Sequence, residues 1–146
     1  MEIRTINPTD AELLVPVFDA YRQFYEQPSD EERALVYLSE RLPARDCFGI
    51  VAVSETGTAA GMALVYPTFS SVRMKPIWTL NDFFVVPEHR GSGLAGQIME
   101  ALYDLARDKG IGQLNLITHT TNERAQAHYR KMGWNQSEFL RFEREL

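Results

Sequence analysis

The segment from Leu80 to Gly96 reads LNDFFVVPEHRGSGLAG and joins two different sequence patterns. Its first part is an apolar run with the length of a buried strand, and this run ends at Pro87. Arg90 and a glycine-rich turn follow, and from Leu94 onward the apolar residues recur at helical spacing. The segment therefore predicts a strand, a tight glycine turn and an amphipathic helix in succession.

This predicted strand, turn and helix favour an anion site. Glycine lets a ligand approach the backbone closely, and the first turn of a helix offers N–H groups and the positive end of the helix dipole. Arg90 adds a positive charge suited to phosphate oxygens. A simpler interpretation, a tight turn beside a surface arginine, stays open on these residues alone.

Two well-known phosphate loops do not fit this segment. Residues 91–96 match the pattern GxGxxG, but a dinucleotide fingerprint belongs in the first strand–helix unit and needs an acidic residue at the end of the next strand. Here the next predicted strand, over 113–119, ends in Thr118 and His119. The Gly-Lys-Ser/Thr of a nucleoside triphosphate loop is absent.

Patterns on both sides of this segment predict further helices and strands. Before it we expect a strand over 2–6, two helices separated by residues 28–30, strands over 47–53 and 60–66, a loop over 68–71 and a strand over 77–86. After it we expect a helix to 110, a strand over 113–119, a helix that Asn122 caps and that runs through Met132, and a last strand with Leu140, Phe142 and Leu146 alternating. Neither a linker nor a repeat interrupts this order, so residues 1–146 are predicted to form one α/β domain with a mixed sheet.

Composition narrows the classes of function. The 146 residues are 45% hydrophobic and 24% charged, which is typical of one globular domain, and the net charge of −5 argues against non-specific nucleic-acid binding. Cys47 is the only cysteine, which excludes an internal disulfide, and we expect an inert buried thiol. The first residues do not form a signal-peptide pattern, and no apolar stretch approaches the about 18–20 residues of a membrane span. We therefore expect a soluble, cytoplasmic protein with neither nucleic-acid nor membrane partners.

Two motifs resemble a known family. Residues 86–95, VPEHRGSGLA, resemble the acetyl-CoA pyrophosphate loop of the GNAT superfamily of N-acetyltransferases, in which Arg90, Gly93 and Ala95 fill the pattern Arg/Gln-x-x-Gly-x-Gly/Ala. Residues 122–134, NERAQAHYRKMGW, resemble the family's second motif, with His and Trp in two positions where the family has other aromatic residues. The run LNDFFV further resembles the spermidine/spermine (diamine) acetyltransferase branch and its bacterial relatives, in which an acidic residue stands in place of Asn81.

The resemblance implies a fold and a set of donor-binding residues. The fold is a GNAT-like α/β fold with a mixed, mostly antiparallel sheet of about six to seven strands and about four helices. Acetyl-CoA is the co-substrate, and no metal is implied. The implied contacts are the pantetheine arm with the backbone of Phe83, Phe84 and Val85, the pyrophosphate with Arg90, Gly91, Ser92, Gly93, Leu94, Ala95 and Gly96, and the arm again with Asn122 and Ala125.

The resemblance also implies catalytic roles. Tyr129 is the implied general acid, because the leaving thiolate needs a proton and a phenol with a pKa of about 10 can supply one. The base is left open among Asp82, Glu26 and His119. The acceptor residues are expected to be Tyr25, Glu26, Asn81 and Asp82, because acidic and aromatic side chains suit a cationic amine.

The sequence thus predicts an N-acetyltransferase that moves an acetyl group from acetyl-CoA to a primary amine, a small cationic one, by direct attack in a ternary complex. Two alternatives stay open: a non-catalytic acyl-CoA-binding sensor, and an acetyltransferase that acts on peptide or protein amines. A homodimer is expected as a common state for the family.

Overall fold

The computed structural model describes residues 1–146, which divide into two compact units, Met1–Leu116 and Ile117–Leu146. The first unit contains a five-stranded sheet in the order β1-β2-β3-β4-β5. Its strands are β1 (Glu2–Thr5), β2 (Phe48–Val53), β3 (Ala59–Ser70), β4 (Lys75–Val85) and β5 (Leu114–Asn115). All neighbouring strands pair antiparallel except β4 and β5, which pair in parallel.

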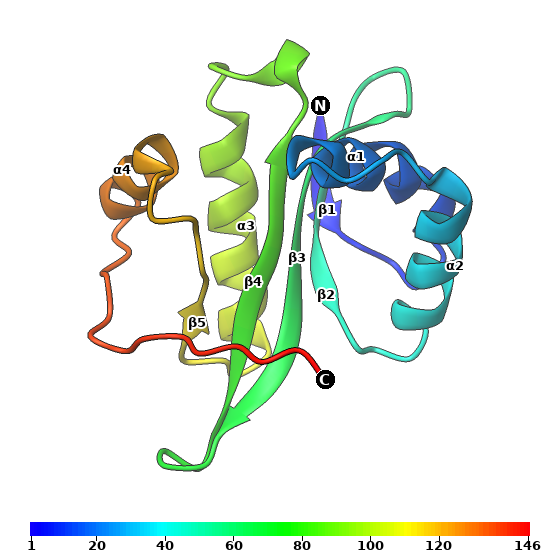
Figure 1. Ribbon diagram of the computed structural model, residues 1–146. Coiled ribbons are helices and arrows are strands. Elements are labelled where there is room, and N and C mark those ends of the chain that lie inside the picture. The colour runs from blue at the N-terminus through cyan, green and yellow to red at the C-terminus, as the bar shows by residue number, and fades with distance from the viewer. The chain divides into compact units, whose positions relative to one another are not determined.

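Helices cover both faces of this sheet (Figure 1). Helices α1 (Ala11–Phe24) and α2 (Glu31–Arg41) lie on one face, and α3 (Leu94–Asp108) lies on the other, preceded by the short helix η1 (Pro87–His89). The core between α1, α2 and the sheet is built from fully buried side chains such as Leu14, Leu38 and Leu64. None of the helices is long and apolar enough to cross a membrane.

The second unit contains α4 (Glu123–Lys131) and otherwise irregular chain. The side chain of Asn122 caps this helix by accepting a hydrogen bond of 3.2 Å from the N–H of Ala125, as the sequence predicted.

The mixed, mostly antiparallel sheet and the four α-helices agree with the prediction, but the number of strands was wrong, since the sheet has five rather than six to seven. The predicted last strand does not form, and Leu140, Phe142 and Leu146 are exposed. Alternating apolar residues form a strand only where another strand pairs with their backbone groups. The second unit contains no strand that could do so.

Two other strand boundaries differ from the prediction. The parallel strand is limited to Leu114 and Asn115 instead of 113–119. Strand β3 continues through Pro67 to Ser70, where a loop was predicted. Proline is tolerated here because the pairing with β2 ends at Val65, so that Pro67 lies where β3 has become an edge strand on that side.

The turn between α1 and α2 is fixed by the buried carboxylate of Asp19. It accepts hydrogen bonds from Ser29 Oγ at 2.7 Å, Asp30 N at 2.9 Å, Gln23 Nε2 at 2.9 Å and Arg22 Nη1 at 3.2 Å. Burial raises the pKa of Asp19, but the Asp30 N–H, the Ser29 hydroxyl and Arg22 together lower it below 3.8.

Replacing Asp19→Ala is therefore expected to destabilise the fold by about 1–3 kcal/mol at pH 7, because several donors lose their acceptor. A group with a lowered folded-state pKa stabilises the fold above its unfolded-state pKa, and this contribution is lost as the pH falls from 3.8 through the folded-state value. Urea unfolding at pH 7 and pH 3 checks this: the difference from wild type should shrink at pH 3. Asp104→Ala, which removes an exposed ion pair with Arg107, is the control and should change little at either pH.

Candidate functional site

A β-bulge in β4 determines which face of the sheet the side chain of Asp82 points to. Leu64 pairs with Asp82 and Val65 pairs with Leu80, so Asn81 is an extra residue in β4. Successive side chains of a strand point to opposite faces, and the extra residue therefore turns Asp82 to the face opposite Leu80. This is the face of Leu64, which packs in the core under α1 and α2.

The carboxyl group of Asp82 is enclosed by the fold. Asp82 is only 8% exposed, and its Oδ2 atom is a buried oxygen with no hydrogen-bond partner. Burial raises the pKa of Asp82 to about 7, and the nearby hydroxyls of Tyr21 and Tyr66 act in the opposite direction. At neutral pH this carboxyl group therefore exchanges a proton readily, which is the property that a general base requires.

Aromatic side chains of α1 lie beside the bulge. The hydroxyl of Tyr21 donates a hydrogen bond of 2.8 Å to the carbonyl oxygen of Asn81. The ring of Tyr21 lies 5.1 Å from that of Tyr25 and 6.1 Å from that of Phe84, and Phe24 also contacts Phe84. Phe24 and Tyr25 are about half exposed, so this aromatic group reaches from the bulge to the surface.

The other sequence-predicted acceptor residue, Glu26, lies apart from this group. It is exposed just beyond the end of α1, with a positive φ of 62°. Its carboxyl group is not buried like that of Asp82, so the geometry favours Asp82 as the base within the first unit.

The backbone of β4 presents alternate residues to its outer edge. The N–H of Val86 bonds to the carbonyl of Ala60 at 3.0 Å, and hydrogen-bonded pairs alternate along an antiparallel ladder. It follows that the backbone groups of Phe84 point toward β3, while those of Phe83 and Val85 point away from β3. On that outer side β5 pairs only with residues 78 and 79. Three residues were predicted to offer backbone groups to the pantetheine arm. The backbone groups of Phe83 and Val85 point in a direction that suits this role. Those of Phe84 do not, and its ring packs against Tyr21 and Arg90 instead.

Arg90 is anchored between this strand and the glycine-rich turn. Its Nε donates to the carbonyl oxygen of Val85 at 2.9 Å, and its guanidinium lies 5.3 Å from the centre of the Phe84 ring. Since the anchoring bond uses Nε, the two terminal nitrogens remain oriented as a fork that suits phosphate oxygens.

The glycine-rich turn leads directly into the first turn of α3. Gly91 and Gly93 have φ values of 75° and 84°, a region that favours glycine. Gly93 is the N-cap residue and brings no capping side chain, so the first N–H groups of α3 have no side-chain acceptor. Ser92 Oγ is turned inward and donates to the carbonyl of His89 at 2.7 Å. Space beside Gly91, Gly93 and Gly96 is open, as the approach of a phosphate requires.

Three residues that the sequence analysis singled out, Asn122, Tyr129 and His119, lie in the second unit. Asn122 uses its side-chain oxygen for the helix cap, which leaves its amide group as the donor for a ligand. Tyr129 is half-buried, with its ring 5.9 Å from that of Trp134 and 6.4 Å from that of His128. His119 Nδ1 lies 2.7 Å from the hydroxyl of Thr121.

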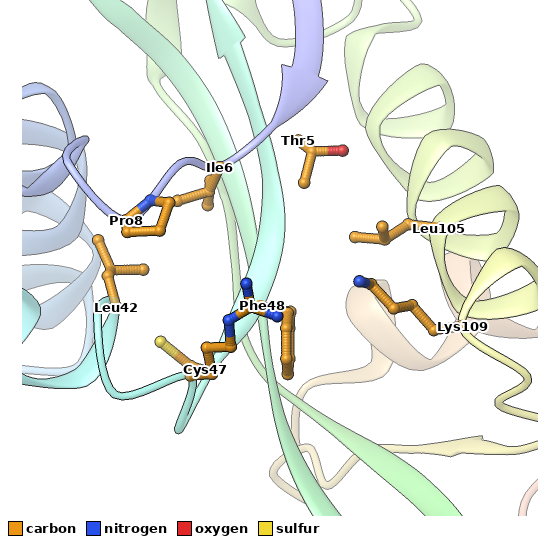
Figure 2. Close-up of a pocket in the computed structure, with 9 residues that line it drawn as sticks. Thr5, Ile6, Pro8, Leu42, Cys47, Phe48, Leu105 and Lys109 are labelled. Atoms are coloured by element: carbon orange, nitrogen blue, oxygen red, sulfur yellow. The ribbon is translucent and has the colours of Figure 1, made fainter.

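A separate cleft of about 180 Å³ lies at the start of β2 (Figure 2). It is lined by apolar residues, by Thr5, Arg45 and Lys109, and by Cys47. The pKa of the Cys47 thiol is raised to about 11 by burial and then by Asp82 and Asp46. The thiol stays protonated at neutral pH, in agreement with the inert cysteine expected from the sequence. Neither Asp82 nor Arg90 lines this cleft.

Sequence reasoning missed two residues near Asp82. Tyr66 ends the predicted part of β3, Tyr37 lies in α2, and neither belongs to a motif. Only the bulge, which the sequence pattern does not reveal, brings the carboxyl group to their side of the sheet.

Comparisons with known proteins agree with one another. The model of the acetyltransferase (GNAT) family matches residues 14–134. An uncharacterized N-acetyltransferase of Bacillus subtilis (strain 168) is 39% identical over 136 residues, which is 93% of this chain and 91% of that protein. A thialysine N-epsilon-acetyltransferase of Bos taurus is 36% identical over 73 residues, 50% of this chain and 42% of that protein. Among solved structures, a probable acetyltransferase is similar with a TM-score of 0.90 and 28% identity, covering 100% of this chain and 98% of the other.

Proposed function

Because the chain belongs to the acetyltransferase (GNAT) family and is thus an acetyl-CoA-dependent acetyltransferase, we propose that it acetylates the primary amine of a small cationic molecule, with Asp82 as the base. The family expected from residues 86–95 and 122–134 is confirmed. The acceptor and the roles of individual residues are the new part of the proposal.

One observation supports a small cationic amine as the acceptor. The buried carboxyl group of Asp82 has an unpartnered oxygen and lies beside aromatic side chains that reach the surface. An ammonium group gains from a carboxylate and from aromatic faces at once. Once bound, it must lose a proton before its nitrogen attacks, and a carboxylate with a pKa of about 7 accepts that proton at neutral pH. The thialysine acetyltransferase among the relatives supports a small amine as the acceptor.

The donor is held by different residues. In the proposal the fork of Arg90 and the first N–H groups of α3 bind the pyrophosphate, because both present donors to an anion. Phe83 and Val85 offer backbone groups to the pantetheine arm, and a backbone N–H there polarises the thioester carbonyl. For Asn122 and Ala125, in the second unit, the proposal keeps the contact with the arm that the family resemblance implies. The amine then attacks the carbonyl carbon, and the carbon–sulfur bond breaks as the tetrahedral intermediate collapses.

The test is a calorimetric titration with acetyl-CoA, followed by a thiol-release assay with a panel of amines. The panel contains thialysine, spermidine, an aminoglycoside and a lysine-containing peptide. We expect acetyl-CoA to bind and thiol to be released with the small cationic amines. Release with the peptide alone contradicts the proposed acceptor, and binding without release for any amine favours the sensor alternative.

Tyr129→Phe is expected to lower kcat by about 10²–10⁴-fold, because the thiolate then leaves without its proton donor. The dissociation constant of acetyl-CoA should stay nearly unchanged, since the ring is retained. Steady-state kinetics and calorimetry on the same preparation measure both quantities. An unchanged kcat removes Tyr129 as the general acid.

A further inference from the structure

Two tyrosines connect the buried carboxyl group of Asp82 to the surface of the first unit. Tyr66, in β3, lies on the same face of the sheet as Asp82, and its hydroxyl is close enough to that carboxyl group to lower the pKa of Asp82. The hydroxyl of Tyr37, in α2, lies 2.9 Å from that of Tyr66, and Tyr37 is 38% exposed. Asp82, Tyr66 and Tyr37 thus form a chain of neighbouring polar groups that runs from the buried carboxyl group to a residue in contact with solvent.

Each link of this chain has the chemistry that proton transfer requires. A hydroxyl donates one hydrogen and accepts through its lone pairs, so it can take a proton on one side as it releases one on the other. Burial, the nearby Asp82 and the bond with Tyr37 all raise the pKa of Tyr66, so its phenol remains neutral. The ring of Tyr37 is held by stacking on Phe18 at 5.8 Å, which keeps its hydroxyl in place.

Two other groups face Asp82. The hydroxyl of Tyr21 in α1 also lowers the pKa of Asp82, and it donates a hydrogen bond to the carbonyl of Asn81. The thiol of Cys47, which faces the same carboxyl group from the start of β2, is buried and stays protonated. Tyr66 and Tyr37 are joined to each other by a hydrogen bond, and Tyr37 reaches solvent.

Each turnover leaves a proton on a carboxyl group that is 8% exposed, and the next turnover needs this group deprotonated. We propose that Tyr66 and Tyr37 pass this proton from Asp82 to solvent, an inference that rests on the proposed role of Asp82 as the base. The carboxylic acid gives its proton to the oxygen of Tyr66, the Tyr66 hydrogen moves to Tyr37, and the Tyr37 hydrogen moves to water. One proton enters at Asp82 and one leaves at Tyr37, and both phenols are regenerated. Tyr66 and Tyr37 act through Asp82 and are positioning residues.

The experiment compares Tyr37→Phe and Tyr66→Phe with wild type, using acetyl-CoA and the best amine of the panel. Both changes keep the ring, and thermal unfolding verifies that the variants fold. We expect kcat to fall on the order of tenfold in each variant, which is a smaller loss than the one expected for Asp82→Asn. The lost activity should return as the buffer concentration rises, because a buffer base must then take the proton from Asp82. Tyr103→Phe on α3, on the other face of the sheet, is the control and should show neither effect.

The two variants should differ in their pH dependence. Tyr66→Phe removes a hydroxyl that lowers the pKa of Asp82, so the acid limb of kcat/KM should move to higher pH. Tyr37→Phe leaves this hydroxyl in place, and its acid limb should move far less. NMR titration of the Asp82 carboxyl carbon follows the same difference without turnover.

The possible outcomes separate the two proposals. Wild-type kcat without buffer dependence in both variants overturns the relay while Asp82 stays the base. An Asp82 titration that is unchanged in Tyr66→Phe overturns the relay too, because the first link is then missing. Full activity of Asp82→Asn would show that Asp82 is not the base, and the proposed relay would then fail as well.

Discussion

Asp82→Asn is expected to lower kcat/KM for the amine by about 10²–10⁴-fold and to leave acetyl-CoA affinity unchanged. Asparagine has nearly the shape of aspartic acid and keeps the packing at the bulge, but it cannot accept a proton. Initial rates of thiol release and a calorimetric titration of acetyl-CoA measure the two quantities. Asp104→Asn, at an exposed position of α3, is the matched control.

The pH dependence sharpens this prediction. A base works only when deprotonated, so wild-type kcat/KM should rise as the pH increases through about 7, the pKa of Asp82. In Asp82→Asn this bend should disappear, leaving the dependence that the amine itself contributes. A bend near pH 7 that persists in the variant assigns the base to another residue.

Loss of folding is not an alternative explanation for such a result. The pKa of Asp82 is about 7 in the folded protein against 3.8 for an ordinary aspartate. The folded state therefore holds more protons between these values, and its stability falls by up to about 1.4 kcal/mol per pH unit as the pH rises through this window. Asparagine removes this loss, so the variant should be at least as stable as wild type at pH 8, which thermal unfolding checks.

The sequence predicted those parts of the fold that depend on local signals. The break between the first two helices at residues 28–30, the helix that begins after Asn122 and the glycine turn before α3 each depend on a few neighbouring residues. The last strand, with Leu140 and Phe142, failed because a strand also needs a partner, and alternation carries no information about one.

The same distinction applies to the candidate site. The direction of Asp82 depends on a single extra residue in β4, and a one-residue shift of register moves a side chain to the opposite face of a sheet. The motif around Arg90 could be recognised in the sequence because its functional groups belong to neighbouring residues. The contacts of Tyr37 and Tyr66 were not readable, since these residues lie on different elements that only the folded sheet brings together.

Gly93→Val is expected to weaken acetyl-CoA binding on the order of 100-fold, equivalent to about 2.7 kcal/mol. Gly93 has φ of 84° and no atom within 4 Å of the position of an added Cβ, so the valine side chain would occupy the open space that the pyrophosphate needs. It would also strain the residue from which the first turn of α3 begins. Calorimetric titration measures the affinity, and the amine assay at saturating acetyl-CoA should recover most of kcat.

Gly57→Val separates the two effects of that substitution. Gly57 has φ of 82° and equally open surroundings, but it lies in the turn between β2 and β3. Because the backbone conformations are nearly the same, both variants should lose similar stability, about 1–2 kcal/mol or somewhat more for a β-branched side chain. Only Gly93→Val should lose affinity for acetyl-CoA. Equal affinities in the two variants would mean that the turn from Arg90 to Gly96 does not hold the pyrophosphate, whereas a loss at Gly93 alone ties the binding to that turn and not to general destabilisation.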